Sequence, residues 1–292
     1  MAIFRETGQV AEGVYLIDTG IWGIAKQNAV YVIQSSNLIA LIDTSTKRET
    51  KTILNALDQF GIETLDFILV THSHIDHCGA IYSFAEQFPK ATICLPSAAK
   101  FLNQEYFKKC EKLGIANPFQ SLKEGAIINL DDDYVLEVIE TPGHISDHLS
   151  FLERKNHILF VGDACGSHHL GEKFSRPTAY APYFDHSAYI KTLLRFQTLN
   201  PAGLAIASYG FASKTDAHNC IQTAIHDYYA WKQTVIDALQ NNYDESHVAE
   251  VLLQNFGRSP GETQEKRSDQ WVKTILTGIA RGFIHSLGLQ KI

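Results

Sequence analysis

The stretch THSHIDHCG, residues 71–79, directly follows the apolar run LDFILV and places three imidazoles and one carboxylate within six positions. In an extended segment alternate side chains share a face, so His72 and His74 can point at one metal ion while Asp76 projects nearby. His77 then lies at the start of a helix and can turn toward an adjacent ion. Imidazole and carboxylate ligands suit Zn²⁺, and also Fe²⁺ or Mn²⁺. The stretch therefore predicts half of a metal site at the end of a buried strand. The alternative is a chance gathering of surface histidines.

Two later strand ends offer further ligands. The run YVLEVIE is followed by TPGH, which ends at His144, and the run HILFV is followed by Gly162 and Asp163. A PGH or a GD means little by itself, but both place a ligand-type side chain on a tight turn directly after an apolar strand. Their order and common placement predict that His144 and Asp163 complete the metal site.

Composition narrows the functional class. The chain has 292 residues with 45% hydrophobic content, which is enough to bury a full core. Its 25 basic and 32 acidic residues give a net charge of −7, and no basic block predicts a nucleic-acid partner. No run approaches the ~20 apolar residues that cross a bilayer, and the N-terminus lacks the apolar centre of a signal peptide. We expect a cytoplasmic protein with a small-molecule substrate and no nucleic-acid or membrane partner, and the sequence leaves a homodimer open.

Five cysteines are spread along the chain without a CxxC pair. An odd, widely spaced set argues against a disulfide framework or a structural zinc knuckle. Cys78 and Cys165 lie beside the ligand clusters, where small buried packing residues are the preferred interpretation and occasional ligands the alternative.

The order of strand and helix patterns predicts a two-part α/β body. Runs at 13–18, 29–34 and 38–43 are rich in Val, Ile and Tyr and predict an antiparallel meander. The next segments alternate, with strands at 65–70 and 91–95 and helices at 49–60, 79–88 and 96–113. A second strand series ends at Gly162, and a helix at 186–198 and a strand at 203–207 complete a domain predicted over residues 1–210.

After Gly210 no further strand is predicted. Amphipathic runs at about 215–240, 244–256 and 268–288 indicate helices, so residues 211–292 form a predicted all-helical C-terminal extension.

With these motifs in place, the sequence resembles the metallo-β-lactamase superfamily over roughly residues 12 to 210. The resemblance implies a four-layer αββα sandwich with the helical extension packing near the active-site cleft. It implies a first metal site at His72, His74 and His144, and a second at Asp76 and His77, with Asp163 bridging them. The GDA form, the THxHxDHCG spacing and the helical extension are most similar to the quinolone-signal thioesterase and lactonase-like branch.

One position departs from the family pattern. The family usually places a last histidine after the final core strand, but here that stretch reads GLAIASYGFAS. Ser208 stands at the best-aligned position, and Tyr209 is the alternative if the alignment shifts by one. Serine is a poor zinc ligand, so the second metal site is predicted to lack one protein ligand. Substitute histidines are conceivable, and His148 is interpreted as a neighbour of the site rather than a ligand; the candidate substitutes are His168, His169 and His186.

The resemblance implies a metal-dependent hydrolase of a small ester, thioester or lactone, using a metal-bound hydroxide that Asp76 orients. One or two Zn²⁺ ions are the expected cofactor, with Fe or Mn as alternatives. Two other functions stay open: a mononuclear iron oxygenase of persulfide-dioxygenase type, and a catalytically faded regulatory or binding protein of the same fold.

The loop after Asp163 is long and aromatic, as expected of a segment that lines a pocket. Tyr180, Tyr183 and Phe184 are predicted to form an apolar wall, and Arg176 to meet a substrate carboxylate or phosphate. The alternative is that the aromatic residues anchor this loop to the core.

Overall fold

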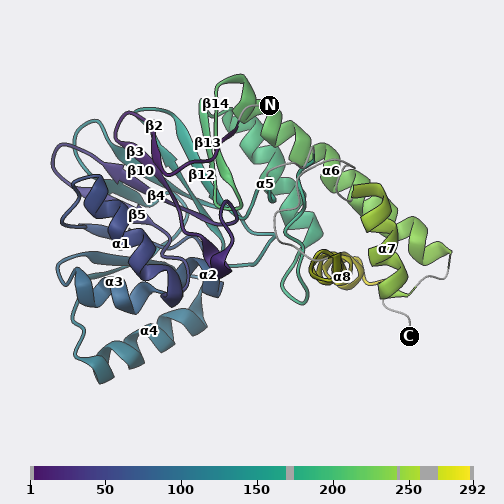
Figure 1. Ribbon diagram of the computed structural model, residues 1–292, viewed down its shortest axis with the longest axis horizontal. Helices are drawn as coiled ribbons and strands as arrows, with labels where there is room; N and C mark the ends of the chain where they lie inside the picture. The colour runs from purple at the N-terminus through teal and green to yellow at the C-terminus, as the bar shows by residue number, and fades with distance from the viewer. Residues whose placement is uncertain (1–2, 169–173, 242–243, 257–268, 290–292) are drawn as a thin grey trace.

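The computed structural model of the protein describes residues 3–168, 174–241, 244–256 and 269–289, with side chains described from residue 272 onward in the last range (Figure 1).

The first sheet has seven strands within the described residues, in the order β2-β3-β4-β5-β6-β7-β8. They are β2 (Gly8–Ala11), β3 (Val14–Asp18), β4 (Ala29–Gln34), β5 (Ile39–Ile42), β6 (Phe67–Leu69), β7 (Thr92–Pro96) and β8 (Phe119–Leu122). Strands β3, β4 and β5 pair antiparallel, which confirms the predicted meander. Strands β5 to β8 then run parallel, and parallel neighbours require crossover connections. The crossovers contain α1 (Thr50–Gln59), α3 (Ile81–Gln87) and α4 (Lys100–Leu113).

The second sheet, again counted over the described residues, has the order β1-β14-β13-β12-β11-β10-β9. Its strands are β1 (Ile3–Phe4), β9 (Ile127–Asn129), β10 (Val135–Glu140), β11 (Leu149–Glu153), β12 (Ile158–Gly162), β13 (Gly203–Ile206) and β14 (Gly210–Ser213). Strands β12 and β13 are parallel, and α5 (His186–Leu199) lies in the connection between them.

The two sheets pack face to face around an apolar layer, and helices cover both outer faces. Tyr31, Phe151 and Phe160 are among the fully or nearly fully buried side chains between the sheets. A second cluster joins the first sheet to α1, α3 and α4, and a third joins the other sheet to α5 and the later helices. Figure 1 shows these helices on opposite sides of the strands. Each buried Leu, Ile or Phe contributes about 1.5–3 kcal/mol. The predicted αββα sandwich is confirmed.

Three helices follow the sandwich: α6 (Thr215–Gln240), α7 (Glu245–Phe256) and α8 (Asp269–Ser286). They form the helical end of the molecule in Figure 1. Helix α8 lies against the loop that precedes α5, because a Cβ on Gly282 would stand 2.4 Å from the backbone oxygen of Ala179. None of the helices in the described part of the chain is long and apolar enough to cross a membrane.

The structure differs from the predicted elements in several places, among them the unpredicted strand β8. Strand β14 (Gly210–Ser213) pairs with β13 beyond the predicted end of strand structure, and its four residues are too short a run to predict. Helix α4 begins at Lys100 because Pro96 is the last residue of β7. The predicted helix 79–88 corresponds to α3, which begins at Ile81, and the short helix α2 (Ile75–Cys78) precedes it. Gly79 lies between them, and a Cβ there would stand 2.3 Å from the oxygen of Ile75.

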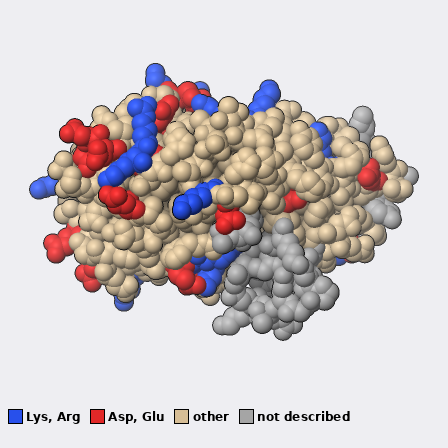
Figure 2. All heavy atoms as spheres, turned by 90° about the horizontal axis from the view of Figure 1, so that it is seen from above, with Lys and Arg blue, Asp and Glu red and all other residues tan. Residues whose placement is uncertain are grey.

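Charged side chains of both signs intermix on the face drawn in Figure 2. They gather over the sandwich end of that face, whereas the helical end carries fewer of them. Interspersed charge favours solubility over attraction of a polyanion.

Candidate metal centre

The predicted ligands come from the ends of strands in both sheets. His72 and His74 follow β6 in the first sheet, whereas His144 follows β10 and Asp163 follows β12 in the second. Because the sandwich brings these strand ends to one edge, side chains separated by up to 91 positions lie within contact distance, as between His72 and Asp163. The rigid sheets therefore position the loops that carry the ligands.

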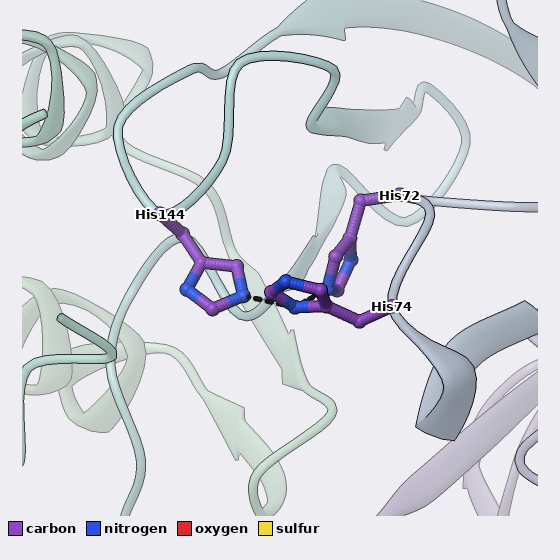
Figure 3. A group of neighbouring side chains, drawn as sticks. All are labelled: His72, His74 and His144. Atoms are coloured by element: carbon purple, nitrogen blue, oxygen red, sulfur yellow. Dashed lines mark hydrogen bonds between the residues drawn. The ribbon is translucent and has the colours of Figure 1, made fainter. Parts of the chain in front are cut away.

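His72, His74 and His144 form what we call the three-histidine cluster. The Nε2 atom of His144 lies 2.8 Å from Nδ1 of His74, and Nε2 of His72 lies 3.0 Å from the same atom. Figure 3 shows the three rings turned toward one another from two separate loops. His72 and His144 are buried and His74 is half-buried. Three imidazole nitrogens therefore converge on one point, which is the arrangement that a metal ion requires.

Hydrogen bonds on the far side of two rings fix which nitrogen faces this point. His144 donates from Nδ1 to the backbone oxygen of Thr178 over 2.6 Å, which leaves an electron pair on Nε2. The Thr71 hydroxyl lies 2.9 Å from the Asp43 carboxylate, which can only accept, so the hydroxyl donates to it. His72 then donates from Nδ1 to the Thr71 oxygen over 3.0 Å. Outer hydrogen bonds of this kind orient metal-binding histidines.

Two histidines of the three-histidine cluster, His72 and His74, resist protonation. Burial, followed by the nearby imidazoles, lowers the pKa of His72 well below its ordinary value. Burial and the neighbouring His144 lower the pKa of His74 to about 3. The rings of His72 and His74 are therefore neutral at neutral pH. A divalent cation fits this set of three imidazole nitrogens.

His77, Asp76 and Asp163 form a second group, which we call the carboxylate cluster. The Nε2 atom of His77 lies 3.6 Å from Asp163 and 3.8 Å from Asp76. That nitrogen is buried and has no hydrogen-bond partner among the described residues. Asp163 also lies 3.5 Å from Nε2 of His144, so it stands between the two clusters. An orphaned nitrogen facing two carboxylates again fits a cation.

Charge distinguishes this cluster from the first. Burial lowers the pKa of His77, but Asp163, Asp43 and Asp76 outweigh that effect and raise it well above the ordinary value. Burial raises the pKa of Asp163, and His77 more than reverses this, so the net direction is downward. His77 and Asp163 are therefore an ion pair near neutral pH. The pKa of Asp76 is raised, chiefly by burial.

Ser208 lies at the carboxylate cluster, and Tyr209 does not. The Ser208 hydroxyl donates to Oδ1 of Asp163 over 3.1 Å. Tyr209 is buried in the layer between the sheets, and its hydroxyl donates to the backbone oxygen of Arg5 over 2.7 Å. The alternative ligand position at Tyr209 is therefore wrong, because its side chain points away from the carboxylates.

The conceivable substitute histidines have other partners. The Nε2 atom of His168 lies 3.3 Å from the backbone oxygen of Cys165, and Nδ1 of His186 lies 3.2 Å from the Ser286 hydroxyl. Within the described residues, neither belongs to the two metal-compatible groups. His169 lies outside the described residues. His148 accepts a hydrogen bond from the backbone N–H of Asp163 over 3.1 Å, so its Nε2 atom is already used.

Asp43 is the functional residue that sequence reasoning missed. Its carboxylate accepts from the Thr71 backbone N–H over 2.8 Å and lies 2.7 Å from Nδ1 of His77. Through Thr71 it also positions His72. The only signal in the sequence is an acid at the end of the apolar run LIALID. Its φ of +64°, in the left-handed region, is the structural sign that this side chain is held in a special place.

Two cavities adjoin the clusters on different sides. A small cavity of about 110 Å³ lies beside the carboxylate cluster and is lined in part by Arg176, Tyr180, Ser208 and Ile275 of α8. A groove of about 610 Å³ lies beside His74 and is lined in part by Tyr183.

The predicted pocket residues are thus divided among the small cavity, the groove and the core. Arg176 and Tyr180 line the small cavity, and Tyr183 lines the groove. Phe184 is only 3% exposed and packs against Phe283 of α8 in the core. The pocket role predicted for Phe184 is wrong, because this ring anchors the loop instead.

Known proteins resemble this chain in both sequence and fold. The family model described as the metallo-beta-lactamase superfamily matches residues 23–206. An uncharacterised protein of Bacillus subtilis, YobT, is 31% identical over 141 residues, covering 46% of this chain and 60% of its own length. Hydroxyacylglutathione hydrolase 1 of Vibrio vulnificus is 30% identical over 148 residues, covering 51% of this chain and 48% of its own. The chain thus spans about half the length of these curated relatives.

A solved structure agrees over nearly the whole chain. The metallo-beta-lactamase family protein TTHA1429 of Thermus thermophilus superposes with a TM-score of 0.69 at 18% identity. It covers 96% of this chain and 95% of its own, which supports the same fold including the helical end.

Proposed function

Because this chain belongs to the metallo-beta-lactamase superfamily, we propose that it is a metal-dependent hydrolase of a small ester, thioester or lactone. The observation that carries the proposal is the pair of adjoining groups at one sandwich edge, one of His72, His74 and His144 and the other of His77 with Asp76 and Asp163. Hydroxyacylglutathione hydrolases among the relatives, whose name denotes thioester hydrolysis, support the thioester class.

In this proposal most of the site residues hold the metal ions, and one orients the attacking water. In this proposal His72, His74 and His144 hold the first ion, and His77 with Asp76 contributes to a second position. Asp163 stands between the two, 3.5 Å and 3.6 Å from the facing nitrogens of His144 and His77. A bound divalent ion supplies Lewis-acid polarisation of a carbonyl and lowers the pKa of water toward ~7.

Asp76 is the proposed catalytic residue. It is half-buried and lines the small cavity together with Asp163, so its carboxylate can contact a molecule in that space. There it can orient the attacking water and accept its proton. The raised pKa of Asp76, chiefly due to burial, makes this carboxylate a better proton acceptor than an exposed one.

The quinolone-signal thioesterase and lactonase-like branch remains the proposed subgroup. Its support is the Gly162-Asp163-Ala164 form and the helices after the sandwich, of which α8 brings Ile275 to the small cavity. A cavity of about 110 Å³ favours a small substrate over a polymer. Zn²⁺ is the proposed metal.

A second candidate is a mononuclear iron oxygenase of persulfide-dioxygenase type. The observation that favours it is Ser208, whose hydroxyl donates to Asp163 where the family usually has a histidine. A carboxylate cluster short of one ligand suits a protein that uses a single ion. A catalytically faded binding protein is the further alternative, in which the fold and one ion are kept without turnover.

Metal content and substrate screening separate these candidates. Protein purified without chelator or nickel is analysed for elements, then tested with thioesters and lactones and, separately, for ferrous-iron-dependent O₂ consumption. We expect hydrolysis, and a loss of at least about 100-fold in Asp76→Ala, as for other positioned acid–base groups. The control is Asp133→Ala, which removes a 74% exposed carboxylate that belongs to neither cluster. O₂ consumption without hydrolysis would favour the oxygenase. Failure of every substrate in fully metallated protein would favour the binding protein.

A further inference from the structure

Thr178 is hydrogen-bonded to a ligand residue of each cluster. Its backbone oxygen accepts from Nδ1 of His144 over 2.6 Å, and its hydroxyl donates to the backbone oxygen of Asp163 over 2.7 Å. His144 follows β10 and Asp163 follows β12, so one residue joins two separate ligand loops. Thr178 is only 6% exposed, which protects both hydrogen bonds from competition by water. The first bond orients a ring of the three-histidine cluster, and the second holds the backbone that carries the shared carboxylate.

Residues 175–180, which we call the support segment, are fixed to the loop after Asp163 at more than one point. Ser167 and Arg176 exchange two backbone hydrogen bonds, of 2.8 and 2.9 Å. The hydroxyl of Thr178 adds the bond to Asp163 two residues further along the segment. A displacement of the support segment therefore moves the Asp163 loop with it, as well as the acceptor of His144.

Helix α8 packs directly against the support segment through two glycines one turn apart. A Cβ on Gly282 would stand 2.4 Å from the backbone oxygen of Ala179 and 2.9 Å from the backbone nitrogen of Tyr180. A Cβ on Gly278 would stand 3.2 Å from the ring of Tyr180. Glycine inside a helix is less favourable than alanine, so this pair is explained by the close approach of the two backbones. The place of residues 179–180 is therefore set by α8.

Helix α6 holds the other end of the support segment. The backbone N–H of Ser175 donates to Oδ2 of Asp227 over 2.7 Å, and Asp227 is buried. Thr178 thus lies between two points at which the helices after the sandwich grip the chain. These helices therefore reach the metal ligands through a single short segment, in addition to forming part of the wall of the small cavity.

We propose that Thr178 is a positioning residue shared by the two clusters, and that α8 sets its place through Gly278 and Gly282. The proposal rests on the metal centre of the proposed hydrolase and names what keeps its ligands in place. The two contacts of Thr178 act differently. Its hydroxyl supports the Asp163 loop alone, whereas its backbone oxygen supports His144, so that a shift of the backbone reaches the three-histidine cluster.

Variants of Thr178 test the hydroxyl. Thr178→Val removes the bond to Asp163 and keeps both the shape of the side chain and the backbone oxygen that His144 needs. We expect the affinity for a second Zn²⁺ ion to fall by about tenfold, as loss of an outer hydrogen bond does at other metal sites, and the affinity for the first to change less. Thr178→Ser, which restores a hydroxyl, should recover most of the loss. The matched control is Thr234→Val, since the Thr234 hydroxyl donates to the backbone oxygen of Ala230 over 2.9 Å within α6.

Variants of the two glycines test the contact with α8. Gly282→Ala requires the backbone at residues 179–180 to shift, so we expect the first Zn²⁺ ion to bind about tenfold more weakly as well. The visible spectrum of the Co²⁺-loaded protein should change with it, because this spectrum follows the geometry of coordination. Gly278→Ala should have a smaller effect, since its Cβ meets only a ring that can turn. Alanine by itself favours the helix, so a loss of affinity points to the contact with the support segment.

Chelator competition with Zn²⁺, the Co²⁺ spectrum and the unfolding temperature of the metal-free protein are measured for every variant. Unchanged Zn²⁺ affinities in Thr178→Val, or a loss that Thr178→Ser does not recover, overturn the role of Thr178. A lower unfolding temperature in Gly282→Ala with unchanged affinities and spectrum makes the contact with α8 merely structural and overturns its role. None of these measurements needs turnover. The expected losses of affinity in a protein that hydrolyses no ester, thioester or lactone would support the positioning role, and the proposed hydrolase function would fail alone.

Discussion

The three-histidine cluster and the carboxylate cluster lie side by side, but the pKa values of their histidines shift in opposite directions. Burial and neighbouring imidazoles lower the pKa of His72 and His74. His77 lies among carboxylates, which raise its pKa well above the ordinary value despite burial. Two rings of the first cluster are therefore neutral at neutral pH, whereas the second cluster favours a proton on His77, where a cation could bind.

One edge of the sandwich therefore contains two metal-binding positions that are not equivalent. A cation entering the three-histidine cluster meets the neutral rings of His72 and His74. A cation entering the carboxylate cluster must displace the proton of His77, and it also finds the Ser208 hydroxyl donating to Asp163. We therefore expect two steps of metal binding, with the three-histidine cluster filled first.

The largest predicted effect comes from Asp43, which supports both clusters. Its carboxylate contacts His77 directly and His72 only through Thr71. We expect Asp43→Asn to weaken metal binding by about 10–100-fold, as loss of outer hydrogen bonds does elsewhere. The second, more weakly bound metal ion should lose more affinity than the first, because the contact between Asp43 and His77 is direct. Competition with a chromophoric chelator measures both steps.

A matched control for this variant is available in the same sheet. Asp66 accepts from the backbone N–H of Ile39 over 2.8 Å, at the start of β5. Asp66→Asn should alter stability but leave both metal affinities unchanged. Unaltered affinities in Asp43→Asn would mean that the two clusters are held by their surrounding packing rather than by this carboxylate.

A smaller effect is expected from supplying the missing ligand. Ser208→His places an imidazole beside Asp163 and should raise the affinity for the second metal ion by roughly tenfold. The affinity for the first metal ion should stay constant. Elemental analysis after dialysis against limiting metal gives the occupancy. Ser208→Ala serves as the comparison, because it removes the hydrogen bond to Asp163 without adding a ligand. If wild-type protein already retains two ions and the variant retains no more, the assignment of Ser208 to the histidine position is wrong.

The sequence could predict the fold and the residues that converge at the clusters, because each of them follows an apolar β run. His72, His144 and Asp163 are ligand-type residues directly after buried strands, and the layered fold brings such strand ends together. Asp43 was not predicted, since one acid after a strand is an ordinary feature. Only the structure shows its carboxylate reaching Thr71 and His77.

Neighbouring aromatic residues show a second limit of the sequence. Tyr183 is 59% exposed on the groove wall, whereas Phe184 beside it is 3% exposed and packed against α8. Both belong to an irregular loop, where no periodicity tells which side chain faces the core. Their different roles depend on α8, which is more than eighty residues further along the chain.

The smallest expected effect is a pH dependence of the affinity for the second metal ion, with no such dependence for the first. It is also the most direct comparison of the two clusters. The pKa of His74 is lowered to about 3, so this ring stays neutral between pH 6 and 8 and the first equivalent should change little. The raised pKa of His77 favours the protonated ring, so each fall in pH favours the proton over the cation. The second equivalent should therefore weaken as pH falls, by up to about tenfold per unit if one proton is displaced. Chelator competition at pH 6, 7 and 8 measures both steps, and parallel weakening of the two equivalents would mean that the clusters share their protons and act as one site.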